Sequence, residues 1–233
     1  MNHRIILLAF GSLLLLAGCS DDDPASPFTN TGIRGHVVDA DGTPREGVAV
    51  GLAYELDEIP ARKDGAKPSL AFNFTVPERS NVRLWITDYA GDLVQVLVDE
   101  TIVAGVHQVS WSGTNQAGER QPFGVYRYHV RIGDGAELAR EFITLPPTPA
   151  SFLDAPHDVT DADGAFAVDG RVIPVGARMI HTDESGTVLG EIEVTPRIRV
   201  VAVRPGDPDP VWVEALLDYA TAGLNDPVRH VLP

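Results

Sequence analysis

Apolar and polar residues alternate in short runs along most of this chain. The runs at 69–78 (SLAFNFTVPE) and 81–88 (NVRLWITD) both place nearly every second residue on an apolar face. A period of two is typical of half-buried β-strands. Turn residues separate the runs, as at Asp41-Gly42 and at 89–92. No long amphipathic helix is evident, so the pattern predicts an all-β chain of the sandwich or barrel kind, and the resemblances described below imply two β-sandwich modules.

The sequence from residue 32 predicts a strand in which Ile33, His36 and Val38 alternate with Arg34 and Val37. The whole phrase at 32–52, GIRGHVVDADGTPREGVAVGL, resembles the opening of the carboxypeptidase regulatory-like domain, a small prealbumin-like β-sandwich. The family's second phrase, Thr-Asp-x-Asp-Gly-x-Phe, is present at 160–166. It normally follows the first closely, but here more than a hundred residues intervene.

Two explanations fit this spacing. Either an insertion splits one domain into residues 32–58 and 151–233, or two partial modules stand in tandem. We favour the insertion because each half alone has too few strands to bury a core.

The second half continues the same resemblance more loosely. Residues 197–206 are similar to the family's penultimate strand and its following Pro-Gly turn. The stretch 211–219 is expected as a further strand, although apolar residues at 212–219 also fit helical spacing. Residues 228–232 would then close the sheet.

Between these halves, four ordered motifs resemble the Ig-like domain of the flagellar hook-capping protein, which is similar to secretion C-terminal sorting domains. They are Asp-x-x-Gly at 88–91, Ala-Gly-x-His at 104–107, Trp-x-Gly-x-Asn-x-x-Gly at 111–118 and Gly-Val-Tyr at 124–126. The resemblance implies an Ig-like β-sandwich over residues 67–145. Ser112 departs from the pattern, because the family usually has Asp there.

The aromatic residues of this segment have two interpretations. The family pattern places aromatics inside, so we expect Trp111 to lie over the core and Tyr126 and Tyr128 to share one face of the last strand. The alternative is a ligand face, because exposed aromatic rings stack on sugars. We favour core packing.

The N-terminus has the three-part layout of a secretory signal peptide, with a basic start, an apolar stretch at 5–16 and small residues before Cys19. The stretch is shorter than the roughly 20 residues that span a bilayer. Leu16-Ala17-Gly18-Cys19 resembles the bacterial lipobox, which implies removal of residues 1–18 and a lipid on Cys19. The alternative is an ordinary signal peptide with a chance cysteine. Because Cys19 is the only cysteine, a structural disulfide within the chain is excluded.

The residues after Cys19 favour an anchored, exported protein. By resemblance to lipoproteins of Gram-negative bacteria, Ser20 rather than Asp favours the outer membrane. Residues 19–31 carry three successive aspartates and two prolines and too little apolar content to pack, so we expect a flexible tether.

The excess of acidic residues limits the kinds of partner that this chain can bind. Asp and Glu outnumber Lys and Arg by 33 to 18, which gives a formal net charge of −15. Such a charge repels nucleic acid and anionic head groups, so the lipid on Cys19 would be the membrane contact. An envelope protein or a glycan is the expected partner.

Known catalytic and metal-binding motifs are missing from the sequence. It contains no His-Glu-x-x-His, no Gly-x-Ser-x-Gly elbow and no phosphate-binding glycine loop. We therefore predict no catalytic residue and no cofactor. The seven histidines are expected at surface or loop positions: His3, His36, His107, His129, His157, His181 and His230.

Two acidic pairs are weak calcium candidates, Asp39 with Asp41 and Asp161 with Asp163. Carboxylate oxygens suit calcium, but neither pair continues into the Asp-rich loop with a later bidentate Glu that a tight site needs. Turn formation is the favoured explanation for these residues.

Two hypotheses about function remain from the sequence. The leading one is a non-catalytic, lipid-anchored envelope protein that serves as an adhesion, scaffold or ligand-binding module. The rival is a cryptic hydrolase, or a transport or secretion accessory factor of the outer membrane, whose carboxylates come together only on folding.

Overall fold

The computed structural model describes residues 32–57, 70–182, 188–206, 209–219 and 228–232. Within these ranges the chain is almost entirely β-strand, with two short 3-10 turns, η1 (Pro149–Leu153) and η2 (Gly170–Val172). The all-β class is confirmed. In the same ranges no helix is long and apolar enough to cross a membrane. Cys19, the signal peptide and the tether lie outside the described residues.

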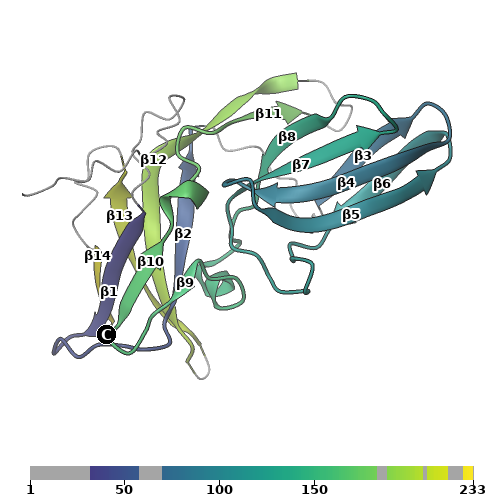
Figure 1. Cartoon of the computed structure of the whole chain (residues 1–233). Coiled ribbons are helices and arrows are strands. Elements are labelled where there is room, and N and C mark those ends of the chain that lie inside the picture. Colours follow the sequence, from purple (N-terminus) through teal and green to yellow (C-terminus); the bar gives the residue numbers. More distant parts are fainter. Residues whose placement is uncertain (1–31, 58–69, 183–187, 207–208, 220–227, 233) are drawn as a thin grey trace, which may run out of the picture.

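One group of strands, here called the base sandwich, joins the two ends of the described chain (Figure 1). One of its sheets has the order β10-β1-β14, and the other has the order β11-β12-β2-β9 with β13 beside β12. β1 and β2 therefore pair with strands from the far end of the sequence. The strands are β1 (Ile33–Asp39), β2 (Ala49–Leu56), β9 (Asp158–Val159), β10 (Ala165–Val168), β11 (Arg178–Thr182), β12 (Val188–Arg204), β13 (Val211–Asp218) and β14 (Val228–Leu232).

The base core lies between these two sheets. Val37 on β1 faces Val50 and Leu52 on β2, and all three are fully buried. The sequence pattern placed His36 with Ile33 on one side of β1, and this is wrong. Alternation from Ile33 runs through Gly35 to Val37, so His36 points outward.

The remaining strands form a second body, here called the outer sandwich (Figure 1). It has a two-stranded sheet, β3-β6, and a four-stranded sheet, β5-β4-β7-β8. Among the described residues, these strands pair only with one another. They are β3 (Leu70–Val76), β4 (Ser80–Asp88), β5 (Leu93–Ile102), β6 (Gly105–Trp111), β7 (Val125–Ile132) and β8 (Leu138–Ile143).

The outer core is built by alternation on both sheets. Phe72, Phe74 and Val76 point inward from β3, while Val82 and Leu84 do so from β4. The intervening residues face solvent, which is the half-buried pattern read from the sequence.

The structure decides the open question at the C-terminal end. Residues 211–218 form strand β13, paired with β12, and not a helix. Residues 228–232 form β14, which runs parallel to β1. The sequence pattern gave no indication of β8 or of β11, and both border the cleft described below.

Candidate functional site

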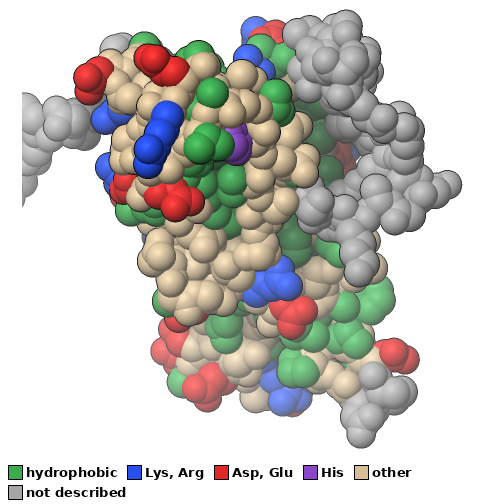
Figure 2. Space-filling view, turned by 90° about the vertical axis from the view of Figure 1, so that its right-hand side faces the viewer, with side chains coloured by type: hydrophobic (Ala, Val, Ile, Leu, Met, Phe, Trp, Pro, Cys, Tyr) green, Lys and Arg blue, Asp and Glu red, His purple; other side chains and the backbone are tan. Residues whose placement is uncertain are grey.

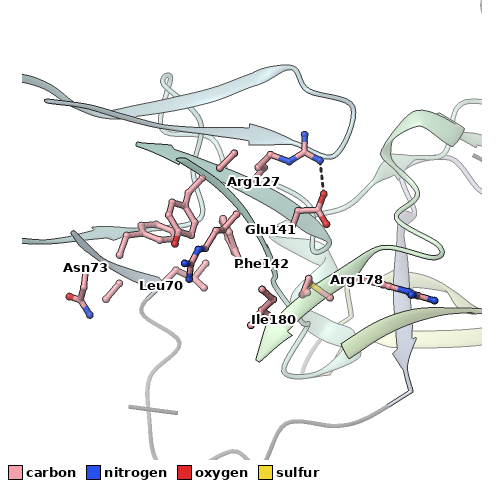
Figure 3. Close-up of a pocket in the computed structure, with 13 residues that line it drawn as sticks. Leu70, Asn73, Arg127, Glu141, Phe142, Arg178 and Ile180 are labelled. Atoms are coloured by element: carbon pink, nitrogen blue, oxygen red, sulfur yellow. Dashed lines mark hydrogen bonds and ion pairs between the residues drawn. The ribbon is translucent and has the colours of Figure 1, made fainter. Parts of the chain in front are cut away.

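A cleft lies where the open side of the outer sandwich faces β11 of the base (Figure 3). Its volume is about 590 Å³. Leu70 and Asn73 of β3 stand on one side, and Arg178 and Ile180 of β11 stand on the other. The side chain of Ile180 is 58% exposed, so β11 offers the cleft an unpacked apolar surface.

The floor of the cleft is aromatic. The ring centroids of Phe72 and Tyr128 are 4.7 Å apart, and those of Phe72 and Phe142 are 5.3 Å apart. Phe72 is 7% exposed, whereas Tyr128 and Phe142 are only half-buried. Two rings that belong to the outer core are thus partly open to solvent within the cleft.

Three arginines and one glutamate give the cleft a local positive charge. Arg127 forms an ion pair with Glu141 at 2.5 Å, drawn as the dashed line in Figure 3. Arg178 pairs with Glu193, which does not line the cleft. Arg140 has no carboxylate partner among the described residues. On the face of the outer sandwich shown in Figure 2, by contrast, acidic and basic side chains are interspersed.

A second hollow continues from the cleft along β3. Its volume is about 270 Å³, and it shares Asn73 and Tyr128 with the cleft. Leu138 of β8 lines it and is 48% exposed, although its cross-strand partner Val130 is buried in the core. The two hollows form one groove that follows β3 from Leu70 to Thr75.

The two sandwiches also meet at a second place, a packed junction around Phe152 that lies beside a hollow of about 360 Å³. The ring of Phe123, in the loop before β7, packs edge-on against Phe152 of η1 with centroids 5.7 Å apart. Phe152 is 1% exposed and lies on Gly51 of β2, where a Cβ would come within 2.0 Å of its ring. Glycine at position 51 is therefore what allows the phenylalanine to approach the sheet.

His157 holds this junction with both of its ring nitrogens. Nδ1 accepts a hydrogen bond from the Leu52 N–H at 3.1 Å. The neutral ring therefore carries its proton on Nε2, which lies 3.5 Å from the Tyr54 hydroxyl, and the ring also hydrogen-bonds to the backbone of Phe123. Burial lowers the pKa of His157 to about 4, and the hydrogen bond to Phe123 opposes that shift. The imidazole is thus neutral at physiological pH.

One hydroxyl, imidazole and carboxylate lie in line on the outer face of the four-stranded sheet. Thr87 Oγ1 is 3.1 Å from Nε2 of His129, and Nδ1 of His129 is 2.7 Å from Glu137. The His129 hydrogen bond and then Arg131 lower the pKa of Glu137. This series has the order of a nucleophile, base and orienting acid, and sequence reasoning missed it because its members are far apart in the chain.

The surroundings of this series do not suit a nucleophile. Thr87 is only 7% exposed, and the Trp85 ring stacks parallel on His129 at 4.9 Å. A reacting carbonyl must come within about 3 Å of the attacking oxygen, and neither of the two hollows above reaches Thr87. The guanidinium groups of Arg83 and Arg131 lie 5.1 Å and 5.8 Å from the Trp85 ring centre, so the whole group is a packed surface network.

The aromatic residues singled out in the sequence lie in the outer core. Trp111 is 2% exposed, and its indole N–H donates to the Thr114 carbonyl at 2.8 Å. Tyr126 is 5% exposed and packs edge-on against Trp111. A sugar-stacking ligand face needs exposed rings, and these two do not offer one. Tyr128 is only half-buried and lines the cleft, whereas the almost fully buried Trp111 borders a separate hollow of about 360 Å³ beside Phe123.

The acidic pairs considered for calcium serve as turn residues. Asp39 is ion-paired with Arg45. Asp41 accepts the Thr43 N–H, which lowers its pKa, and Asp161 accepts the N–H groups of Asp163 and Ala165. The structure does not bring three or more metal-ligating side chains together anywhere in its described ranges.

One histidine departs from the expected surface or loop placement, and another has a structural role in its loop. His157 lies in a loop but holds the junction between the two sandwiches. His230, on β14, is 2% exposed, and burial lowers its pKa. Its Nε2 finds no hydrogen-bond partner among the described residues. His3 lies outside those residues.

Comparison with known proteins identifies one part of the chain. The family model of the FlgD Ig-like domain matches residues 57–135, which contain β3 to β7. This part of the chain is therefore Ig-like, in agreement with the motifs between Asp88 and Tyr126. The match covers roughly a third of the chain. No curated protein sequence matches it.

Proposed function

We propose that this chain is a non-catalytic, lipid-anchored protein of the bacterial envelope that binds a partner in the cleft between its two sandwiches. One observation carries the binding role: two partly open aromatic rings, an exposed isoleucine and an arginine with no carboxylate partner among the described residues converge there from β7, β8 and β11. Apolar surface with a few convergent polar groups is the usual composition of a binding site.

The pairing of the strands supports a particular domain arrangement. In the described parts of the chain, β1 and β2 pair with β10, β12 and β14, whereas β3 to β8 pair only with one another. We infer a carboxypeptidase regulatory-like domain, residues 32–58 with 151–233, into which an Ig-like domain at 67–145 is inserted. This arrangement brings a cleft-lining arm of the base, β11, next to β8.

The anchor is proposed from the sequence around Cys19. A fatty-acid analogue fed to the producing bacterium should label the natural protein but not a Cys19→Ala variant. The labelled protein should sediment with outer membranes, and the variant should become soluble. An unlabelled, soluble natural protein would remove the anchor from the proposal.

The binding role is tested by site-specific photo-crosslinking in cells. A photoreactive amino acid replaces Ile180 in the cleft or, as a matched control, Val106 on β6, which is 77% exposed. We expect a discrete crosslinked envelope species from position 180 that is missing from position 106. Equal crosslinking at both positions, or none at position 180, contradicts a binding role for the cleft.

A further inference from the structure

Strand β3 has a neighbour on one side only. It pairs with β6 along its whole length, and no other described strand pairs with it. In an antiparallel pair, alternate residues of an edge strand direct their N–H and C=O groups away from the partner. Among the described residues, β3 therefore presents to the groove a row of backbone donors and acceptors that no neighbouring strand pairs.

The opposite sheet is wider than the sheet that β3 belongs to. Ig-type sandwiches pack sheets of about three and four strands, whereas the described sheets here have two and four. Phe142 of β8 packs against Phe72 of β3, but the rest of the inner face of β8 has no described strand opposite it, which explains why Leu138 and Arg140 are exposed at inward-facing positions. One more strand beside β3 would cover both residues.

The dimensions of the groove fit an extended chain. It follows β3, a strand of seven residues, and its two parts enclose about 590 and 270 Å³. The edge of β3 forms one wall, and Leu138, Arg140 and Phe142 of β8 line the other. Backbone pairing together with side-chain pockets is how proteins bind peptides by strand addition.

The positive charge of the groove favours an acidic peptide. Arg140 projects from the same face as Tyr128 and has no carboxylate partner among the described residues, and Arg178 lies across the cleft. This is a positive site on a chain of net charge −15. An acidic side chain of the bound strand would complete the Arg140 ion pair.

The sequence immediately before β3 does not fit this charge. Residues 58–69 contain Arg62, Lys63 and Lys67 against only Glu58 and Asp64. They also contain prolines at 60 and 68, which cannot donate a backbone hydrogen bond. Cationic side chains would face the arginines of the cleft.

We propose that the groove accepts an extended, acidic segment of a partner protein as an added β-strand beside β3. The backbone of β3 pairs with the segment, its apolar side chains cover Leu138 and Tyr128, and an acidic side chain binds Arg140. This inference names the partner class for the proposed binding cleft and rests on that function.

The test uses the mature chain carrying Cys19→Ala and synthetic peptides as long as β3. The acidic probe alternates valine and threonine and ends in two glutamates, and a second probe ends in two lysines. Fluorescence anisotropy should show the acidic probe binding at least about tenfold more tightly than the lysine probe, as expected for one close charge pair. A third probe, with prolines at alternate positions, should not bind because it lacks the N–H donors.

Two charge reversals locate the site. Arg140→Glu should weaken the acidic probe about tenfold and reverse the preference between the probes. Arg34→Glu, an equal charge change at an exposed position of β1, should leave both affinities unchanged. Circular dichroism confirms that both variants fold.

Several results would overturn the proposal. They are equal binding of the acidic and lysine probes, undiminished binding of the proline probe, equal effects of the two arginine variants, or no binding of the acidic probe up to about 1 mM. If crosslinking at position 180 still captures a partner, the binding role survives and only strand addition is wrong.

Discussion

Strands β2 and β3 follow one another in the sequence, and each pairs along one edge with a long partner strand, β12 or β6. Their other edges differ. β2 is closed by β9, by Thr160, and by His157, whose Nδ1 accepts the Leu52 N–H. β3 has no such closure among the described residues. An open edge favours unwanted association, so proteins usually cap or charge it. This chain can therefore cover a strand edge with side chains. Because the edge of β3 is left uncovered among the described residues, it is the candidate binding edge.

The packed junction around Phe152 should contribute far more to the free energy of unfolding than the side chains that line the groove along β3. Phe152→Ala removes a fully buried ring that bridges Gly51 and Phe123, so we expect a loss of about 3–5 kcal/mol in the free energy of unfolding. Denaturant titration of the purified chain measures it. The matched variant Ile180→Ala, on the cleft side, should change stability by less than about 0.5 kcal/mol. Similar losses in the two variants would contradict the contrast between junction and groove.

Acid should weaken the junction through His157. Its pKa is about 4 in the folded chain against 6.5 for an ordinary histidine, so the unfolded state binds the proton more readily between these values. Stability should therefore fall as the pH drops from about 6.5 and level off below pH 4, by roughly 3 kcal/mol in all.

The variant His157→Gln provides the reference for this titration. Glutamine does not ionise, so the slope of stability against pH should be shallower between pH 6.5 and 4 than in the natural chain. The remaining slope includes His230, whose pKa is also lowered by burial. Parallel profiles for the two proteins would show that His157 does not govern the acid sensitivity of the junction.

The ion pair at the cleft should matter little for folding. Arg127 and Glu141 are partly exposed, and pairs of this kind contribute about 0.2–1 kcal/mol. We expect Arg127→Gln to lower the unfolding free energy within that range, with a smaller effect in high salt. A loss above about 2 kcal/mol would mean that the cleft is as tightly built as the junction.

The smallest effect is expected for Arg140. It has no carboxylate partner among the described residues, so Arg140→Glu should shift the melting temperature only slightly, by an amount equivalent to less than about 0.5 kcal/mol. Calorimetry can measure this. A marked stabilisation would indicate that Arg140 is strained in the free protein, and a marked loss would indicate a structural contact that the groove account omits.

Most of the fold was readable from the sequence because most strands are half-buried. The alternation around Phe72 and Leu84 identified β3 and β4, and the turn at Asp88–Asp92 marked where β4 ends. β8 escaped because its inward position 140 is an arginine that faces the groove rather than a core. Arg140 therefore breaks the alternation that would have predicted β8, and the same residue lines the proposed binding groove.

The remaining misses have the same origin in long-range packing. β11 is short, and its exposed Ile180 gives no alternation that distinguishes it from a loop. His157 reads as an ordinary loop histidine until folding places it against β2. The contact between Thr87 and His129 joins residues 42 positions apart, and only strand pairing brings them together.

The most direct measurement of the central claim is amide hydrogen exchange of β3 beside that of β2. We predict that in the free protein alternate amides of β3 exchange rapidly while those of β2 are protected, and that the acidic probe slows the β3 amides alone. If the β3 amides are already as protected as those of β2, or if the probe leaves them unchanged, the edge is not the binding surface and the account is contradicted.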